Sequence, residues 1–142
     1  MAATVVFDVA DQVIVLLDEP AGLIVVRWSR FGDHDTFTRS LDVQAELIEA
    51  GRARFIVVDI GETTGTPSAM DHDYVNRFVY PRYRRGGLKA IVTVIPHSAR
   101  TRMGTKGWNR SGRTWRFAMH EAATVQDARD LLERTYPTVA AP

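Results

Sequence analysis

The stretch that decides the fold runs from Arg54 to Tyr74 and reads RFIVVDIGETTGTPSAMDHDY. It opens with a continuous apolar run that ends at Asp59, a pattern typical of a strand buried on both faces of a sheet. A loop rich in hydroxyl groups follows, and Ser68 with Asp71 has the spacing of a capping box at a helix start. The stretch therefore predicts a buried strand, a polar loop and a helix.

Three apolar runs precede this stretch, at Val5–Val9, Val13–Asp18 and Leu23–Arg30. They are rich in β-branched and aromatic residues, and the links between them are short. Short links join antiparallel neighbours, so we expect a meander of three strands. In the third run the alternation places Val26 and Trp28 toward the core.

A helix is expected between the meander and the buried strand. Asp35 or Thr36 is the predicted N-cap, and Gly51 is the predicted stop. The expected inward face recurs at helical spacing and consists of Phe37, Leu41, Ala45 and Ile48.

The helix that begins after Ser68 is expected to turn Met70, Tyr74 and Phe78 toward the core. Pro81 lacks a backbone donor, so we expect it to kink or end this helix. The glycines of RRGG then close the segment.

The remaining chain continues the alternation of strands and helices. LKAIVTVIP is expected to form a buried strand, SARTRMGTKGWN a weak helix, and TWRFAMHE the last strand. Thr124 caps a terminal helix with an apolar stripe, and residues 137–142 are expected to fray. The predicted fold is α/β: one domain, residues 1–142, with a mixed sheet that is antiparallel at its N-terminal end and parallel later, flanked by helices.

Several of these motifs together resemble the SpoIIAA-like proteins of the STAS/SEC14-like fold, relatives of bacterial anti-sigma-factor antagonists. The likeness rests on VVRWS, FIVVDIGETTG, YPRYRRGGLKAIVTVIP and the final TVQDARDLLERTYP. It implies a non-catalytic regulatory or protein-interaction domain with a protein partner. In such antagonists a kinase phosphorylates a serine near the start of the helix after this strand, so the candidate phosphoacceptors here are Thr63, Thr64 and Ser68. The structural alternative is that these hydroxyls only satisfy loop amides and cap the helix.

The SEC14 side of the resemblance implies an alternative function, the binding of a small apolar or lipid-like ligand. We expect a ligand or partner to meet the loops after two neighbouring strands, where α/β sheets place their sites. The candidate residues of those loops are Asp59, Glu62, Gly65, His97 and Ser98. The candidate lining of an apolar pocket is Phe78, Tyr80, Met103 and Trp108, which ordinary core packing would explain equally well.

Charge is divided unevenly along the chain. Residues 1–75 carry 5 basic and 13 acidic side chains, a net of −8, whereas residues 76–142 carry 13 and 4, a net of +9. Either the two halves neutralise each other, or the basic segment Arg77–Arg116 binds an acidic partner or nucleic acid, the last being the less favoured hypothesis. The candidate basic surface consists of Arg82, Arg84, Arg85, Arg100, Arg102 and Lys106.

The sequence shows no catalytic motif, so we expect no enzyme, no cofactor and no metal site. The four histidines are widely spaced, and the absence of cysteine fits a reducing compartment. The start of the chain does not resemble a signal peptide and no apolar run is long enough to cross a bilayer. We therefore expect a cytoplasmic protein of bacterial type with no membrane insertion. A homodimer that pairs through an exposed sheet edge is an additional hypothesis.

Overall fold

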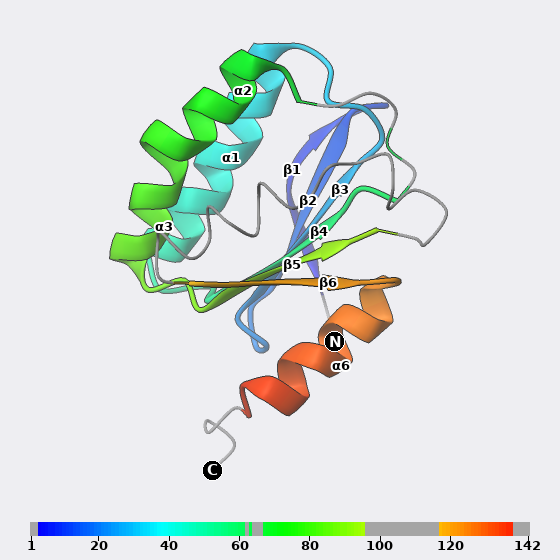
Figure 1. Cartoon of the computed structure of the whole chain (residues 1–142), viewed down its shortest axis with the longest axis vertical. Coiled ribbons are helices and arrows are strands. Elements are labelled where there is room, and N and C mark those ends of the chain that lie inside the picture. Colours follow the sequence, from blue (N-terminus) through cyan, green and yellow to red (C-terminus); the bar gives the residue numbers. More distant parts are fainter. Residues whose placement is uncertain (1–2, 62, 64–66, 96–116, 138–142) are drawn as a thin grey trace.

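The computed structural model describes residues 3–61, 63, 67–95 and 117–137. Six strands form one sheet whose order in space follows the order in sequence (Figure 1). The strands are β1 (Thr4–Val9), β2 (Val13–Asp18), β3 (Leu23–Trp28), β4 (Phe55–Asp59), β5 (Ala90–Val94) and β6 (Ala118–Ala122).

The sheet is mixed, as the sequence predicts. β1, β2 and β3 pair antiparallel through short turns, whereas β3, β4, β5 and β6 pair parallel. The central strands are the most apolar, and every residue of β5 is buried. Strands covered on both faces have no solvent side, which is why β4 and β5 carry continuous apolar runs instead of alternating ones.

Helices cover both faces of the sheet. One face carries α1 (His34–Glu49) and a second helical stretch made of α2 (Ala69–Tyr74), η1 (Val75–Val79) and α3 (Tyr80–Gly86), whereas α6 (Val125–Thr135) lies on the other face (Figure 1). Alternate residues of the central strands therefore enter two separate apolar cores. Among the described residues, no helix has the length and apolar character needed to span a bilayer.

The start of α1 differs from the sequence prediction by a few residues. Asp33 is the N-cap, and its carboxylate accepts a hydrogen bond of 2.7 Å from the backbone N–H of Thr36. Neither Asp35 nor Thr36 caps the helix, because the extended residue at the boundary is Asp33. The predicted stop is confirmed, since Gly51 adopts the left-handed φ of 76° that ends a helix.

The capping box at Ser68 is confirmed, but of the predicted inward face of the helix that it starts only Tyr74 packs against the core. Ser68 and Asp71 exchange side-chain and backbone hydrogen bonds, and Asp71 is the residue that turns inward. Met70 and Phe78 consequently lie outside and are 62% and 54% exposed. Tyr74 is half-buried because its hydroxyl reaches α1.

Pro81 does not end the helix. Instead the chain makes one π-helical turn immediately before it, in which the N–H of Tyr80 donates to the carbonyl of Val75, five residues earlier. The helix then continues as α3 with Pro81 in its first turn, where a missing N–H is tolerated. Gly87, at φ 87°, closes α3 as the RRGG motif predicts.

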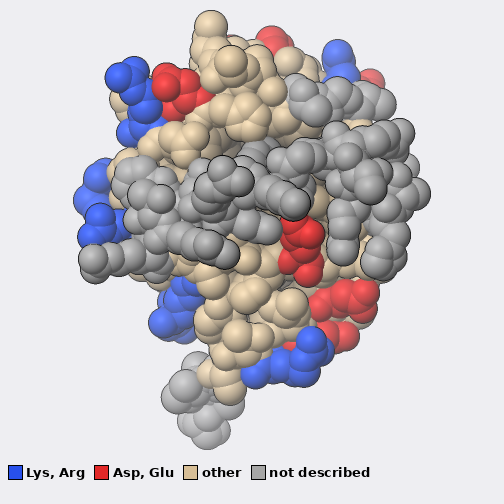
Figure 2. All heavy atoms as spheres, in the orientation of Figure 1, with Lys and Arg blue, Asp and Glu red and all other residues tan. Residues whose placement is uncertain are grey.

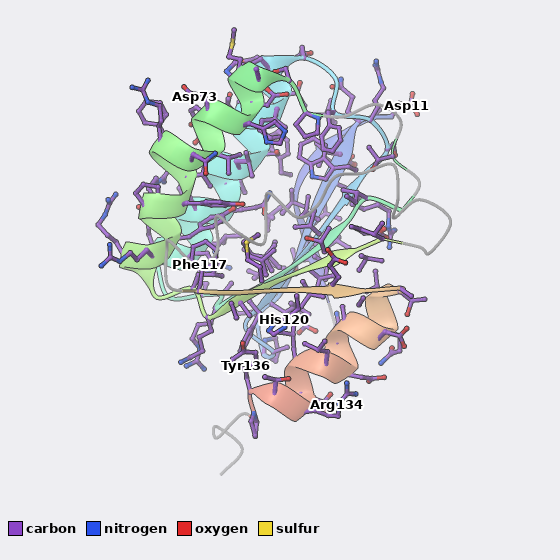
Figure 3. The ribbon with its side chains drawn as sticks, viewed as in Figure 1. Asp11, Asp73, Phe117, His120, Arg134 and Tyr136 are labelled. Atoms are coloured by element: carbon purple, nitrogen blue, oxygen red, sulfur yellow. The ribbon has the colours of Figure 1, made fainter. Side chains whose placement is uncertain are left out.

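The C-terminal helix follows the predicted pattern. Thr124 caps α6 by accepting from the N–H of Asp127 at 3.0 Å, and Ala128 and Leu132 are buried beneath the sheet. On that face the ring of His120 contacts the hydroxyl of Tyr136 at 3.1 Å (Figure 3). Burial lowers the pKa of His120, so this contact is one between neutral groups at physiological pH.

Candidate functional site

A cavity of 370 Å³ lies between the sheet and the helices of the α1 face. β3, β4, β5 and β6 supply one wall, and α1, α2, η1 and α3 supply the other. The described lining consists of Val26, Trp28, Phe31, Phe37, Leu41, Gln44, Ile56, Val58, Pro67, His72, Val75, Asn76, Tyr80, Tyr83, Ile91 and Met119. This volume falls within the range of small-molecule sites in proteins, about 300–1,000 Å³.

Aromatic rings occupy two parts of this lining. Trp28, at the carboxyl end of β3, lies 5.2 Å from Phe31 and 5.5 Å from Phe37 between ring centroids. Tyr80 and Tyr83 form the second group on α3, with centroids 6.1 Å apart. Phe117, which immediately precedes β6 and is labelled in Figure 3, is not in the described lining. Its ring centroid lies 5.3 Å from that of Tyr80 and 6.3 Å from that of Tyr83.

The described lining contains no Asp, Glu, Lys or Arg, and His72 is the one histidine in it. Gln44 is 1% exposed and donates its amide to the carbonyl of Ser40 at 3.2 Å, within α1. Burial raises the pKa of the Tyr80 and Tyr83 phenols far above their usual range, so both remain protonated.

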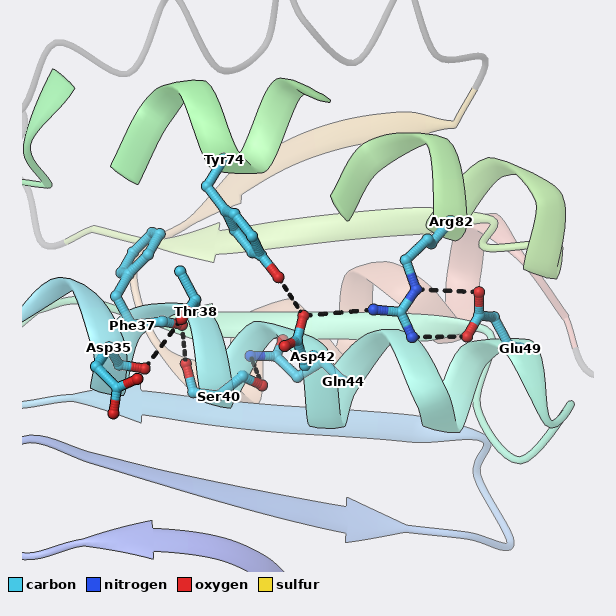
Figure 4. A network of polar contacts seen from close by, with 9 residues as sticks. All are labelled: Asp35, Phe37, Thr38, Ser40, Asp42, Gln44, Glu49, Tyr74 and Arg82. Atoms are coloured by element: carbon cyan, nitrogen blue, oxygen red, sulfur yellow. Dashed lines mark hydrogen bonds and ion pairs between the residues drawn. The ribbon is translucent and has the colours of Figure 1, made fainter. Parts of the chain in front are cut away.

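A polar cluster fixes the helical wall outside the cavity (Figure 4). Arg82 forms a bidentate pair with Glu49 at 3.0 and 2.8 Å and also contacts Asp42 at 3.4 Å. The hydroxyl of Tyr74 donates to the same Asp42 at 2.5 Å. These bonds join α1 to α2 and α3 within the helical layer that covers this face of the sheet.

A second polar contact joins the beginning of α1 to the beginning of α2. The buried carboxylate of Asp71 meets Nδ1 of His34 at 2.6 Å and accepts from the backbone N–H of Ser68 at 2.9 Å. Pro67 precedes Ser68 and His72 follows Asp71, and both line the cavity. The contact therefore anchors the end of the cavity that lies near the predicted polar loop.

The predicted loop residues are placed in different surroundings. Asp59 ends β4 and is held by Arg27 at 3.2 Å and by the N–H of Gly61 at 3.0 Å. Thr63 is half-buried, and its hydroxyl donates to the carbonyl of Trp28, the last residue of β3, at 2.7 Å. Ser68 is exposed and accepts from the N–H of Asp71. The candidates outside the described residues are Glu62, Thr64, Gly65, His97 and Ser98.

The described residues of the predicted basic surface differ in their surroundings: one is paired with acidic side chains and two are exposed. Arg82 is neutralised by Glu49 and Asp42, as the hypothesis of mutual neutralisation expects, and these acids raise its pKa. Arg84 and Arg85 are exposed near the end of α3, a region where basic side chains show at the left edge of Figure 2. Arg100, Arg102 and Lys106 lie outside the described residues.

The predicted pocket lining is partly correct. Tyr80 lines the cavity, whereas Phe78 points away from it; Met103 and Trp108 lie outside the described residues. The sequence pattern assigned Trp28 and Phe37 to the core, where they are, but gave no sign that the core beside them is hollow. The described residues contain no group of three His, Asp or Glu side chains placed to share a metal ion.

Comparison with known proteins adds no assignment. No protein-family model matches the chain, and a search of curated proteins gives no match. The structure by itself establishes a mixed α/β fold with a six-stranded sheet.

Proposed function

We propose that this chain is a non-catalytic binding domain that encloses a small, uncharged, largely apolar ligand between its sheet and the helices α1, η1 and α3. The observation that carries the proposal is the 370 Å³ cavity with an aromatic and aliphatic lining. The resemblance to SpoIIAA-like proteins of the STAS/SEC14-like fold supports it, because an apolar ligand pocket is a property of the SEC14 side of that group.

The energy of packing favours an occupied cavity. The apolar lining of this partly open cavity lacks packing contacts wherever no protein atoms face it. A ligand that contacts the lining recovers part of this loss, so the fold has a thermodynamic reason to bind one.

A one-residue filling of the cavity tests the proposal. Leu41 lies on α1 in the lining, whereas Leu131 lies on α6 under the opposite face, and both are half-buried. The probe is the neutral dye phenylnaphthylamine, whose fluorescence rises in apolar surroundings. We expect the wild type and Leu131→Trp to bind it and Leu41→Trp to lose binding. Equal binding by both variants, or none by the wild type, would overturn the proposal.

A second candidate function is the regulated binding of a protein partner, and the exposed Ser68 favours it. Ser68 is the one candidate phosphoacceptor among the described residues whose side chain is exposed, and it lies beside the exposed Met70. A phosphate there would face the carboxylate of Asp71, so it would break the capping box that starts α2. Mass spectrometry of protein purified from its own host tests this candidate function, and a phosphate on Ser68 is the expected result. A phosphate on Thr63 instead of Ser68, or no phosphate at all, would contradict it.

A further inference from the structure

The size of the cavity limits the ligand to a compact molecule. An engineered protein cavity of about 150 Å³ accommodates one benzene ring. A volume of 370 Å³ therefore suits a compound of about two fused rings with a small substituent. A molecule with long acyl chains exceeds this space, so the lipid-like ligand implied by the SEC14 resemblance is not the best match.

The walls favour a flat ring. The described lining has aromatic groups at both ends, with Trp28, Phe31 and Phe37 near the carboxyl end of β3 and Tyr80 with Tyr83 near the start of β6. Trp28 and Phe37 are already stacked, with an interplanar angle of 30°. Aromatic rings gain energy from offset stacking and edge contacts beyond their buried area, and an aliphatic chain of equal size gains none of this.

The tyrosine hydroxyls indicate where the ligand is polar. Tyr83 is 2% exposed and Tyr80 is 6% exposed, and both line the cavity. Since burial keeps both phenols protonated, each carries an O–H donor in an otherwise apolar lining. An acceptor oxygen is the ligand group that such donors recognise.

The described lining carries no Asp, Glu, Lys or Arg side chain, which favours an uncharged ligand. A carboxylate, phosphate or ammonium group would lose its hydration in this cavity and gain no opposite charge from the described residues. An uncharged compound avoids this cost.

We propose that the cavity binds a planar, uncharged, fused-ring aromatic compound whose carbonyl-type oxygen accepts hydrogen bonds from Tyr80 and Tyr83. This inference rests on the proposed function, and it adds the chemical class and the orientation of the ligand. The ring lies among the aromatic walls, and its oxygen points toward α3.

Three probes separate the parts of this inference. Methyl naphthyl ketone has the ring and the acceptor, naphthalene has the ring alone, and methyl nonyl ketone has the acceptor alone. Their affinities are measured by isothermal titration calorimetry for the wild type, Tyr83→Phe and Tyr74→Phe. The last variant is a matched control, because the Tyr74 hydroxyl is bonded to Asp42 and Tyr74 is not in the described lining.

We expect methyl naphthyl ketone to bind best and to lose about 2- to 10-fold in affinity in Tyr83→Phe, the range of one hydrogen bond. Naphthalene should bind Tyr83→Phe and the wild type equally, and Tyr74→Phe should behave as the wild type with every probe. The inference would be overturned if methyl nonyl ketone bound more tightly than methyl naphthyl ketone. It would also be overturned if Tyr83→Phe lowered the affinities for naphthalene and for methyl naphthyl ketone equally. Either result would leave the proposed function standing. Failure of all three probes would overturn both.

Discussion

Removal of the Asp71 carboxylate should destabilise the protein far more than removal of its exposed neighbour Asp73. The Asp71 side chain is 5% exposed and serves two elements at once, through the contact with His34 at 2.6 Å and the bond from the N–H of Ser68 at 2.9 Å. Hydrogen bonds to a charged group contribute about 1.5–3 kcal/mol each. His34 is partly exposed, so in the variant water takes over part of its contact with the missing carboxylate. The expected loss for Asp71→Ala is therefore about 2–3 kcal/mol.

Thermal and urea unfolding followed by circular dichroism measure this loss. For a domain of this size, about 2–3 kcal/mol corresponds to a fall in Tm of about 6–12 °C. Asp73→Ala is the matched control, since Asp73 is 59% exposed and only faces Arg77 across one helical turn at 3.7 Å. It should change stability by no more than about 0.5 kcal/mol. Equal losses for the two variants would refute the argument that Asp71 joins α1 to α2.

Three further predictions concern packing, pH and capping. Gly86→Ala should cost about 1–3 kcal/mol of unfolding free energy in urea, because an added Cβ would lie 2.7 Å from Ile48 Cγ2 and 3.1 Å from backbone atoms; an unchanged midpoint would contradict this close packing. Burial, and then Asp42, raise the pKa of Tyr74 to about 12, so its contribution to stability is complete below about pH 10 and is lost as the pH rises through about 12. Tyr74→Phe should abolish that part of the pH dependence of unfolding, and an unchanged pH profile would contradict it. Ser68→Ala should lower the free energy of unfolding by about 1 kcal/mol, because it removes the N-cap of α2. Ser68→Thr keeps a hydroxyl and should lower it by less. Equal losses would show that the cap does not contribute.

The sequence predicted the sheet well because the signals for it are local. The apolar run from Phe55 to Asp59 is buried on both faces of the sheet, and short turns joined β1, β2 and β3 as antiparallel neighbours. The caps at Ser68 and Thr124 were also predicted, since the donor and acceptor of a cap lie within one helical turn.

The inward face of α2 was not predictable from spacing alone. Met70, Tyr74 and Phe78 recur at helical spacing, but Asp71 takes the inward position because it bonds His34, a residue 37 positions earlier in the chain. The π turn before Pro81 shifts the register again. Both effects depend on tertiary contacts, which a period of 3.6 residues does not contain.

The sequence predicted one described residue of the cavity lining, Tyr80, but not the place of the cavity. Trp28, Phe37 and Ile56 have the same apolar character whether the space between sheet and helix is filled or hollow. The cavity depends on how side chains from four strands and several helices meet, and residues far apart in the sequence contribute to it. The sequence placed a ligand at the ends of the strands, whereas the cavity lies between the sheet and the helices, with Pro67 at its loop end.

The measurement that tests the central claim most directly is native mass spectrometry of the protein purified from its own host, before and after denaturation. We predict a bound mass of a small uncharged compound that is lost on denaturation, is retained by Leu131→Trp and is absent from Leu41→Trp. A bound mass that Leu41→Trp retains as fully as the wild type would contradict the account, because the ligand would then lie outside the cavity.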